Sequence, residues 1–139
     1  YDAFKKGCDA FVATEQLTGT LPQNIAEDFE LVARSLIQSD EKVTLEVLQA
    51  LVYGWQKLKD TFKSSGEDLH GPAWRVLDAT LNAFDVGMNR LEKAPPNIPV
   101  RAAAYRELRA RWEKMTEPGS KEGYRRHAPI PKIVDALTE

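Results

Sequence analysis

Apolar side chains recur every three or four residues along most of the chain, and no segment of useful length alternates with a period of two. This spacing places apolar side chains on one face of an α-helix. The pattern predicts five helices, at roughly 2–17, 23–38, 40–63, 72–93 and 100–116. Because the connections between them are short, we predict an all-α, single-domain bundle of four to five helices, mostly antiparallel, followed by an irregular C-terminal tail.

Local signals mark several of the predicted helix ends. Ser39 or Asp40 suits the N-cap of the third helix, and Gly66 suits a left-handed position just beyond its end. Pro72 suits the first position of the fourth helix, where its missing N–H has no helical partner to lose. The stretch 94–99 holds three prolines and predicts a stiff linker before the fifth helix.

The third and fourth helices carry small residues beside a large apolar face, which predicts that both are central. The pairs Ala50/Gly54 and Ala83/Gly87 lie about equally far from the turn at 64–72. Glycine inside a helix costs about 1 kcal/mol relative to alanine, so its presence calls for a reason. We expect the two pairs to meet and to let the helices pack closely. The alternative is a groove there for an apolar small molecule.

Length and composition fit one ordinary globular domain. The chain has 139 residues, of which 42% are hydrophobic and 29% are charged. No apolar run approaches the roughly 20 residues that span a bilayer, so no membrane span is expected. Residues 1–95 carry 10 basic and 15 acidic side chains, and residues 96–139 carry 9 and 6. The basic excess of residues 96–139 is smaller than that of dedicated nucleic-acid-binding domains.

Cys8 is the sole cysteine, which excludes an intramolecular disulfide and a thiolate zinc site. Its place between Phe4 and Phe11 on the apolar face of the first helix predicts a buried side chain. Nothing requires an oxidising compartment, which favours the cytoplasm. The sequence begins at Tyr1 rather than Met, so a signal peptide or a neighbouring domain could precede it, and localisation stays open.

Candidate chemistry is sparse, and we expect no enzyme, no metal and no cofactor. His70 and His127 are the two histidines. Glu67 and His70 have the Glu-x-x-His spacing of di-iron bundles, but such sites need a second pair and two further glutamates. No serine elbow, glycine-rich phosphate loop or paired zinc ligands are found.

The fifth helix and the tail are basic, with aromatic residues interleaved on the helix, a pattern that nucleic-acid-binding surfaces share. Two i,i+4 pairs, Glu107–Arg111 and Arg109–Glu113, favour an ion-paired, solvated helix instead. Nucleic acid is therefore a possible but not a favoured partner. The residues that such an interface would use are Arg106, Arg109, Arg111, Lys114, Lys121, Arg125 and Arg126.

We divide the chain into a helical bundle over 1–116 and a proline-punctuated basic tail over 117–139. The tail ends in a short amphipathic segment whose apolar residues have helical spacing, and such a helix needs a surface to pack on. That surface is either the bundle itself or a partner, which is another protein or a second copy of the chain. The candidate partner-binding residues are Ile130, Ile133, Val134 and Leu137, with Tyr124, Arg125 and Arg126 as a polar rim.

These patterns favour a non-enzymatic helical module that binds another protein or self-associates. A nucleic-acid-binding accessory protein and an apolar small-molecule carrier, with its ligand between the third and fourth helices, remain the alternatives.

Overall fold

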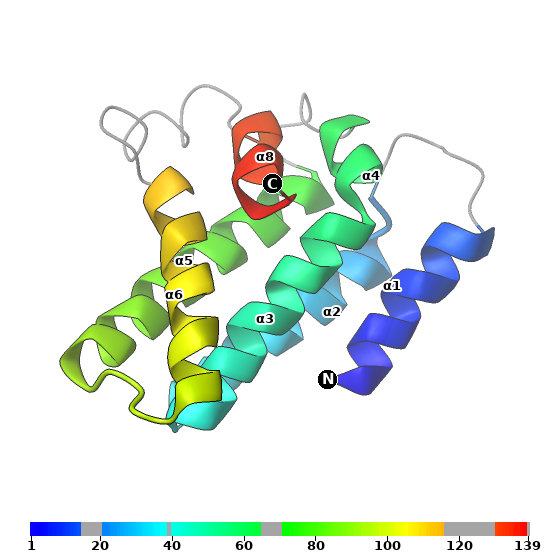
Figure 1. Ribbon diagram of the computed structural model, residues 1–139. Coiled ribbons are helices and arrows are strands. Elements are labelled where there is room, and N and C mark those ends of the chain that lie inside the picture. Colours follow the sequence, from blue (N-terminus) through cyan, green and yellow to red (C-terminus); the bar gives the residue numbers. More distant parts are fainter. Residues whose placement is uncertain (15–20, 39, 65–70, 116–129, 139) are drawn as a thin grey trace.

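The computed structural model describes residues 1–14, 21–38, 40–64, 71–115 and 130–138. Within these ranges the chain forms α-helices, one 3-10 turn and no strand, which confirms the all-α prediction. The helices pack into one body that includes the short C-terminal helix (Figure 1). The elements are α1 (Asp2–Thr14), α2 (Gln23–Arg34), the 3-10 turn η1 (Ser35–Gln38), α3 (Glu41–Lys57), α4 (Lys59–Ser64), α5 (Pro72–Lys93), α6 (Pro99–Met115) and α8 (Ile130–Thr138).

Helix α3 occupies the middle of the bundle and contacts α1, α2, α5, α6 and α8. Helix α5 runs back antiparallel to it and packs closely on α2 (Figure 1). A seam of apolar residues spaced three and four positions apart along α5 is buried; it consists of Trp74, Leu77, Leu81, Phe84, Met88 and Leu91. Helix α6 is anchored by Trp112, whose ring stacks on Phe84 with 5.9 Å between centroids. The hydrophobic pattern thus identified the central elements correctly.

The predicted third helix is interrupted at Leu58, where φ is −105° and ψ is 22°. The break brings the ring of Phe62 onto that of Trp55, with 3.8 Å between centroids and 13° between planes. Along a straight helix, residues seven apart are separated by about 10 Å, so an unbroken helix could not stack these rings. The expectation of one helix over 40–63 is therefore wrong, and its two parts are α3 and α4.

The predicted second helix also ends differently, because its last residues form the 3-10 turn η1. The side chain of Arg90 on α5 donates a hydrogen bond to the carbonyl of Leu36. The last carbonyls of a helix lack partners within the helix, and an arginine from a neighbour can satisfy one of them. The sequence pattern of α2 contains no sign of this long-range contact.

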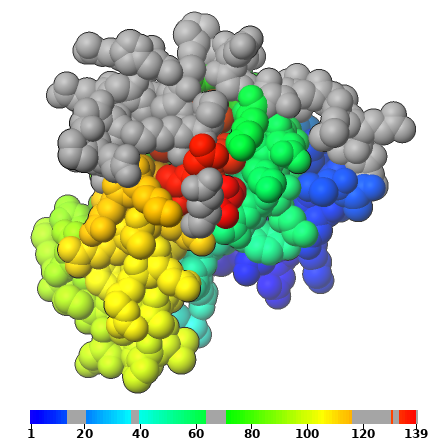
Figure 2. Space-filling model, turned by 45° about the horizontal axis from the view of Figure 1, so that its top comes forward, coloured from blue at the N-terminus to red at the C-terminus, as the bar shows by residue number. Residues whose placement is uncertain are grey.

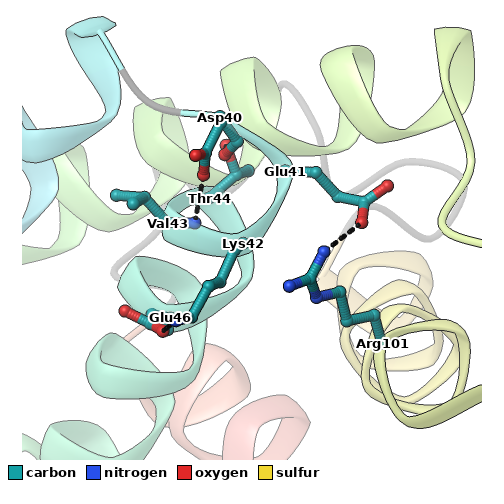
Figure 3. A network of polar contacts seen from close by, with 7 residues as sticks. All are labelled: Asp40, Glu41, Lys42, Val43, Thr44, Glu46 and Arg101. Atoms are coloured by element: carbon teal, nitrogen blue, oxygen red, sulfur yellow. Dashed lines mark hydrogen bonds and ion pairs between the residues drawn. The ribbon is translucent and has the colours of Figure 1, made fainter. Parts of the chain in front are cut away.

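The N-terminus of α3 carries the predicted cap (Figure 3). The Asp40 carboxylate accepts a hydrogen bond of 2.9 Å from the amide of Val43. Glu41, in the first turn, pairs with Arg101 of α6 at 3.3 Å. The cap therefore fixes where α3 begins, and the ion pair ties that end to α6. The proposed C-terminal glycine, Gly66, lies outside the described residues.

Helix α1 buries some of its apolar side chains and leaves others in solvent. Phe4 and Cys8 are buried, whereas Tyr1 is 40% and Val12 46% exposed. Burial raises the pKa of the Cys8 thiol to about 12, with smaller contributions from the nearby charges of Asp9 and Asp28. Cys8 therefore behaves as a buried apolar residue, as predicted.

The two mid-helix glycines face different neighbours. A methyl group added to Gly54 would lie 2.6 Å from the ring of Phe29 and 2.8 Å from that of Phe4. One added to Gly87 would lie 2.8 Å from the Cδ1 atom of Leu48. Rings from α1 and α2 thus fill the space beside Gly54, while a side chain of α3 fills the space beside Gly87. Both glycines permit close packing, and the two do not face each other; a contact between Ala50 and Ala83 stays a prediction.

Candidate functional site

The apolar residues of the C-terminal helix are buried within this chain. Ile130, Ile133, Val134 and Leu137 each have an exposed fraction of 0%, because α8 packs on α3, α4 and α6. Figure 2 shows α8 seated between α6 and the α3–α4 pair. The assignment of these four side chains to a partner-binding face is therefore corrected, and the bundle's own surface receives them. Their proposed rim, Tyr124, Arg125 and Arg126, lies outside the described residues.

Polar contacts fix the end of α8 as well. The carbonyl of Leu137 accepts hydrogen bonds from Gln56 at 3.0 Å and from Arg111 at 2.5 Å. Lys63 of α4 pairs with Asp135 at 3.5 Å. Two helices distant in sequence thus bind one carbonyl at the C-terminal end of α8, where a positive charge is favourable.

The basic face of α6 is partly used for internal contacts. The predicted Arg109–Glu113 pair is present at 3.3 Å. Arg111, expected to pair with Glu107, donates instead to Leu137. Arg106 and Lys114 are exposed, while Lys121 lies outside the described residues with Arg125 and Arg126. The described part of this face therefore gives little support to a nucleic-acid-binding surface.

An open groove lies between α2 and α5. It encloses about 470 Å³, within the range of about 300–1,000 Å³ typical of ligand sites. We call it the α2–α5 groove; its lining consists of Glu30, Ala33, Arg34, Leu36, Ala79, Asn82, Ala83, Val86 and Arg90.

Small side chains open this groove. Ala33 on α2 and Ala79 and Ala83 on α5 stand where leucine-sized residues would fill the space between the helices. Of the four residues proposed for a helix contact or groove, Ala83 alone lines it. Ala50, like Gly54, is instead buried on α3. The predicted groove lay between the third and fourth helices, whereas this one lies between α2 and α5, because α5 turns this part of its surface toward α2.

Arginines dominate the charged edge of the α2–α5 groove. Glu30 is paired with Arg75 at 2.6 Å and lies 3.9 Å from Arg34, whose side chain is 65% exposed. Arg90 sits at the other end, beside the carbonyl of Leu36 that it binds. Because the carboxylate of Glu30 already has a close partner, the edge retains a net positive charge. An occupant with an apolar side and an acidic group would complement it.

The described ranges hold no group of three or more His, Cys, Asp or Glu side chains placed to bind a metal ion. His70 and Glu67, the one pair with metal-like spacing, and His127 lie outside those ranges. Nor does any described helix have the length and apolar character needed to cross a membrane.

Comparison with protein-family models, curated proteins and solved structures gave no match for this chain, so its own geometry is the basis for inferring what it does.

Proposed function

We propose that the protein is a non-enzymatic interaction module whose α2–α5 groove receives an amphipathic helix of a protein partner. The observation that carries this proposal is the pairing of an apolar, alanine-lined floor with an arginine-rich edge. The α5 side of the groove runs from Ala79 to Arg90, about 16 Å along the axis or three helical turns. A groove of this length accommodates apolar side chains at i, i+4 and i+7 of a partner helix.

Charge complementarity defines the partner further. Arg34 is exposed at one edge, and its nearest carboxylate, Glu30, is engaged more closely by Arg75. A partner helix with a Glu or Asp beside its apolar stripe would pair with Arg34 without displacing that contact. Exposed charge pairs contribute little energy, so burial on the alanine floor supplies most of the affinity, while Arg34 contributes orientation and specificity.

The test is selection of helical twelve-residue peptides from a display library on the intact protein. Selected peptides should combine an apolar i, i+4, i+7 stripe with an acidic residue. Ala79→Phe, which fills the half-buried floor, should weaken their binding at least about tenfold, and Arg34→Glu should weaken acidic peptides selectively. Lys59→Glu, an exposed charge reversal on α4, is the matched control. Peptides that bind both groove variants as well as wild type would contradict the proposal.

A second candidate, an amphipathic small molecule, is favoured by the volume of the groove. The anionic apolar dye anilinonaphthalene sulfonate distinguishes the two. If the natural occupant is a small molecule, the dye binds and Ala79→Phe abolishes its signal, while the library gives no groove-dependent peptide. If the occupant is a helix, selected peptides displace any bound dye.

A further inference from the structure

A second hollow lies over α3, between α1 and α6, and encloses about 360 Å³. We call it the α3 pocket. Its apolar wall includes Val52, Ala104 and Leu108. Its polar wall comes from three helices distant in sequence, with Lys5 on α1, Gln49 and Gln56 on α3, and Arg111 on α6.

The cationic groups of the α3 pocket are held in place by contacts that do not neutralise them. The Lys5 ammonium lies 5.4 Å from the centroid of the Tyr53 ring, a cation–π distance. The Tyr53 hydroxyl donates to Asp9 at 2.6 Å, which raises the pKa of Tyr53 and keeps the phenol neutral. Arg111 is oriented by the carbonyl of Leu137, which engages one of the five N–H donors of its guanidinium.

The pocket is therefore preorganised for an anion. Two cations, Lys5 and Arg111, face a single lining carboxylate, Glu107. Gln49 and Gln56 add amide N–H groups, which donate well to carboxylate or phosphate oxygens. Because Arg111 and Gln56 are already fixed by α8, little side-chain entropy is lost when a ligand binds them.

We propose that the α3 pocket is a binding site for a small molecule that carries one carboxylate or phosphate group on a flat apolar body. The anionic group contacts Lys5 and Arg111, and the body lies on Val52 and Leu108. The α2–α5 groove has no part in this site, so each proposal can fail without the other.

The experiment is an amide NMR titration of the intact protein with benzoate, with phenyl phosphate and with neutral benzamide. We expect the two anions to shift the side-chain amides of Gln49 and Gln56 and the backbone signals around Val52, while benzamide binds much more weakly. A stronger response to benzoate or to phenyl phosphate identifies which anionic group the site prefers.

Three substitutions outside the core test whether the anion binds in the α3 pocket. Gln49→Glu places a negative charge at an exposed position of the lining and should weaken anion binding about tenfold, as expected for one unit charge a few ångströms away. Lys5→Gln should also weaken it, whereas Lys6→Gln, an exposed change on the same helix that is not part of the lining, should not. Equal binding of benzamide, shifts that map elsewhere, or wild-type affinity in Gln49→Glu would overturn the proposal.

Discussion

The Nη1 atom of Arg111 lies 2.5 Å from the carbonyl oxygen of Leu137, so that the fourth turn of α6 is joined to the last turn of α8. A carbonyl at a helix C-terminus has no partner within its own helix, and the partial negative charge there favours a cation. Arg111 therefore satisfies a group that α8 cannot satisfy itself.

Removal of this cation should destabilise the protein. We expect Arg111→Met, which keeps the aliphatic stem, to lower the free energy of unfolding by about 1–3 kcal/mol, because a hydrogen bond to a charged group is lost. Arg109→Met, on the same helix but in an exposed ion pair with Glu113, should cost less than about 1 kcal/mol. Urea denaturation of both variants measures the difference, and equal midpoints would contradict the role assigned to Arg111.

Replacement by alanine should change the free energy of unfolding differently at each of the three glycines that lie inside described helices. At Gly7 an added methyl group meets nothing within 4 Å, so Gly7→Ala should stabilise the protein by about 0.5–1 kcal/mol through helix propensity. At Gly87 the obstacle is the flexible end of Leu48, and the change should be close to neutral. At Gly54 two rings must move, and the expected loss is about 1–2 kcal/mol. Thermal or urea unfolding ranks the three variants by stability. A Gly54→Ala protein as stable as Gly7→Ala would refute the claim that two rings must move to admit a methyl group at Gly54.

The buried hydrogen bond between Trp55 and Thr80 joins α3 to α5. The Trp55 indole N–H donates to the Thr80 hydroxyl at 2.9 Å, and both side chains are fully buried. Thr80→Val preserves the shape but leaves the indole without this acceptor, which should cost about 1–3 kcal/mol. Thr44→Val is the control, because the Asp40 carbonyl that Thr44 binds also accepts its backbone amide. Equal stability of the two variants in urea would mean that the buried bond contributes little.

The Cys8 thiol should respond to alkaline pH. Burial raises its pKa from 9.0 to about 12, so between these values an unfolded chain loses the thiol proton while the folded chain retains it. The folded state is then disfavoured as pH rises, by about 1 kcal/mol at pH 10. Wild type should lose more stability than Cys8→Ala between about pH 8 and pH 10, a window that spans the unfolded thiol's pKa. Native protein should also react with a thiol reagent far more slowly than unfolded protein, and equal rates would contradict burial.

Sequence periodicity predicted the fold because each main helix has a continuous apolar face. The seam from Trp74 to Leu91 shows this most clearly, since a spacing of three and four residues leaves no other buried arrangement. It missed the break at Leu58 because both sides of the break have helical spacing. The benefit of the break is the stack of Phe62 on Trp55, a tertiary contact that no local pattern encodes.

The candidate sites were less accessible to sequence reasoning. Alanines such as Ala79 and Ala83 signal a close approach or a groove, but which of the two depends on the neighbouring helix. The α3 pocket joins Lys5 to Arg111, more than one hundred positions apart, and no spacing rule links them. Helical spacing in the tail indicated correctly that Ile133 and Leu137 need a surface, yet it could not identify that surface as the chain's own bundle.

The stack of Trp55 on Phe62 has an optical consequence. Trp55 is fully buried and Trp74 is 8% exposed, whereas Trp112 is only partly buried on α6, so the three indoles differ in their contact with solvent. Emission from an indole depends on the polarity around its ring and on the acceptor of its N–H. Because α4 holds Phe62 over Trp55, a Trp74→Phe protein would have an emission spectrum whose blue edge follows the junction of α3 and α4 and whose red edge follows the surface of α6.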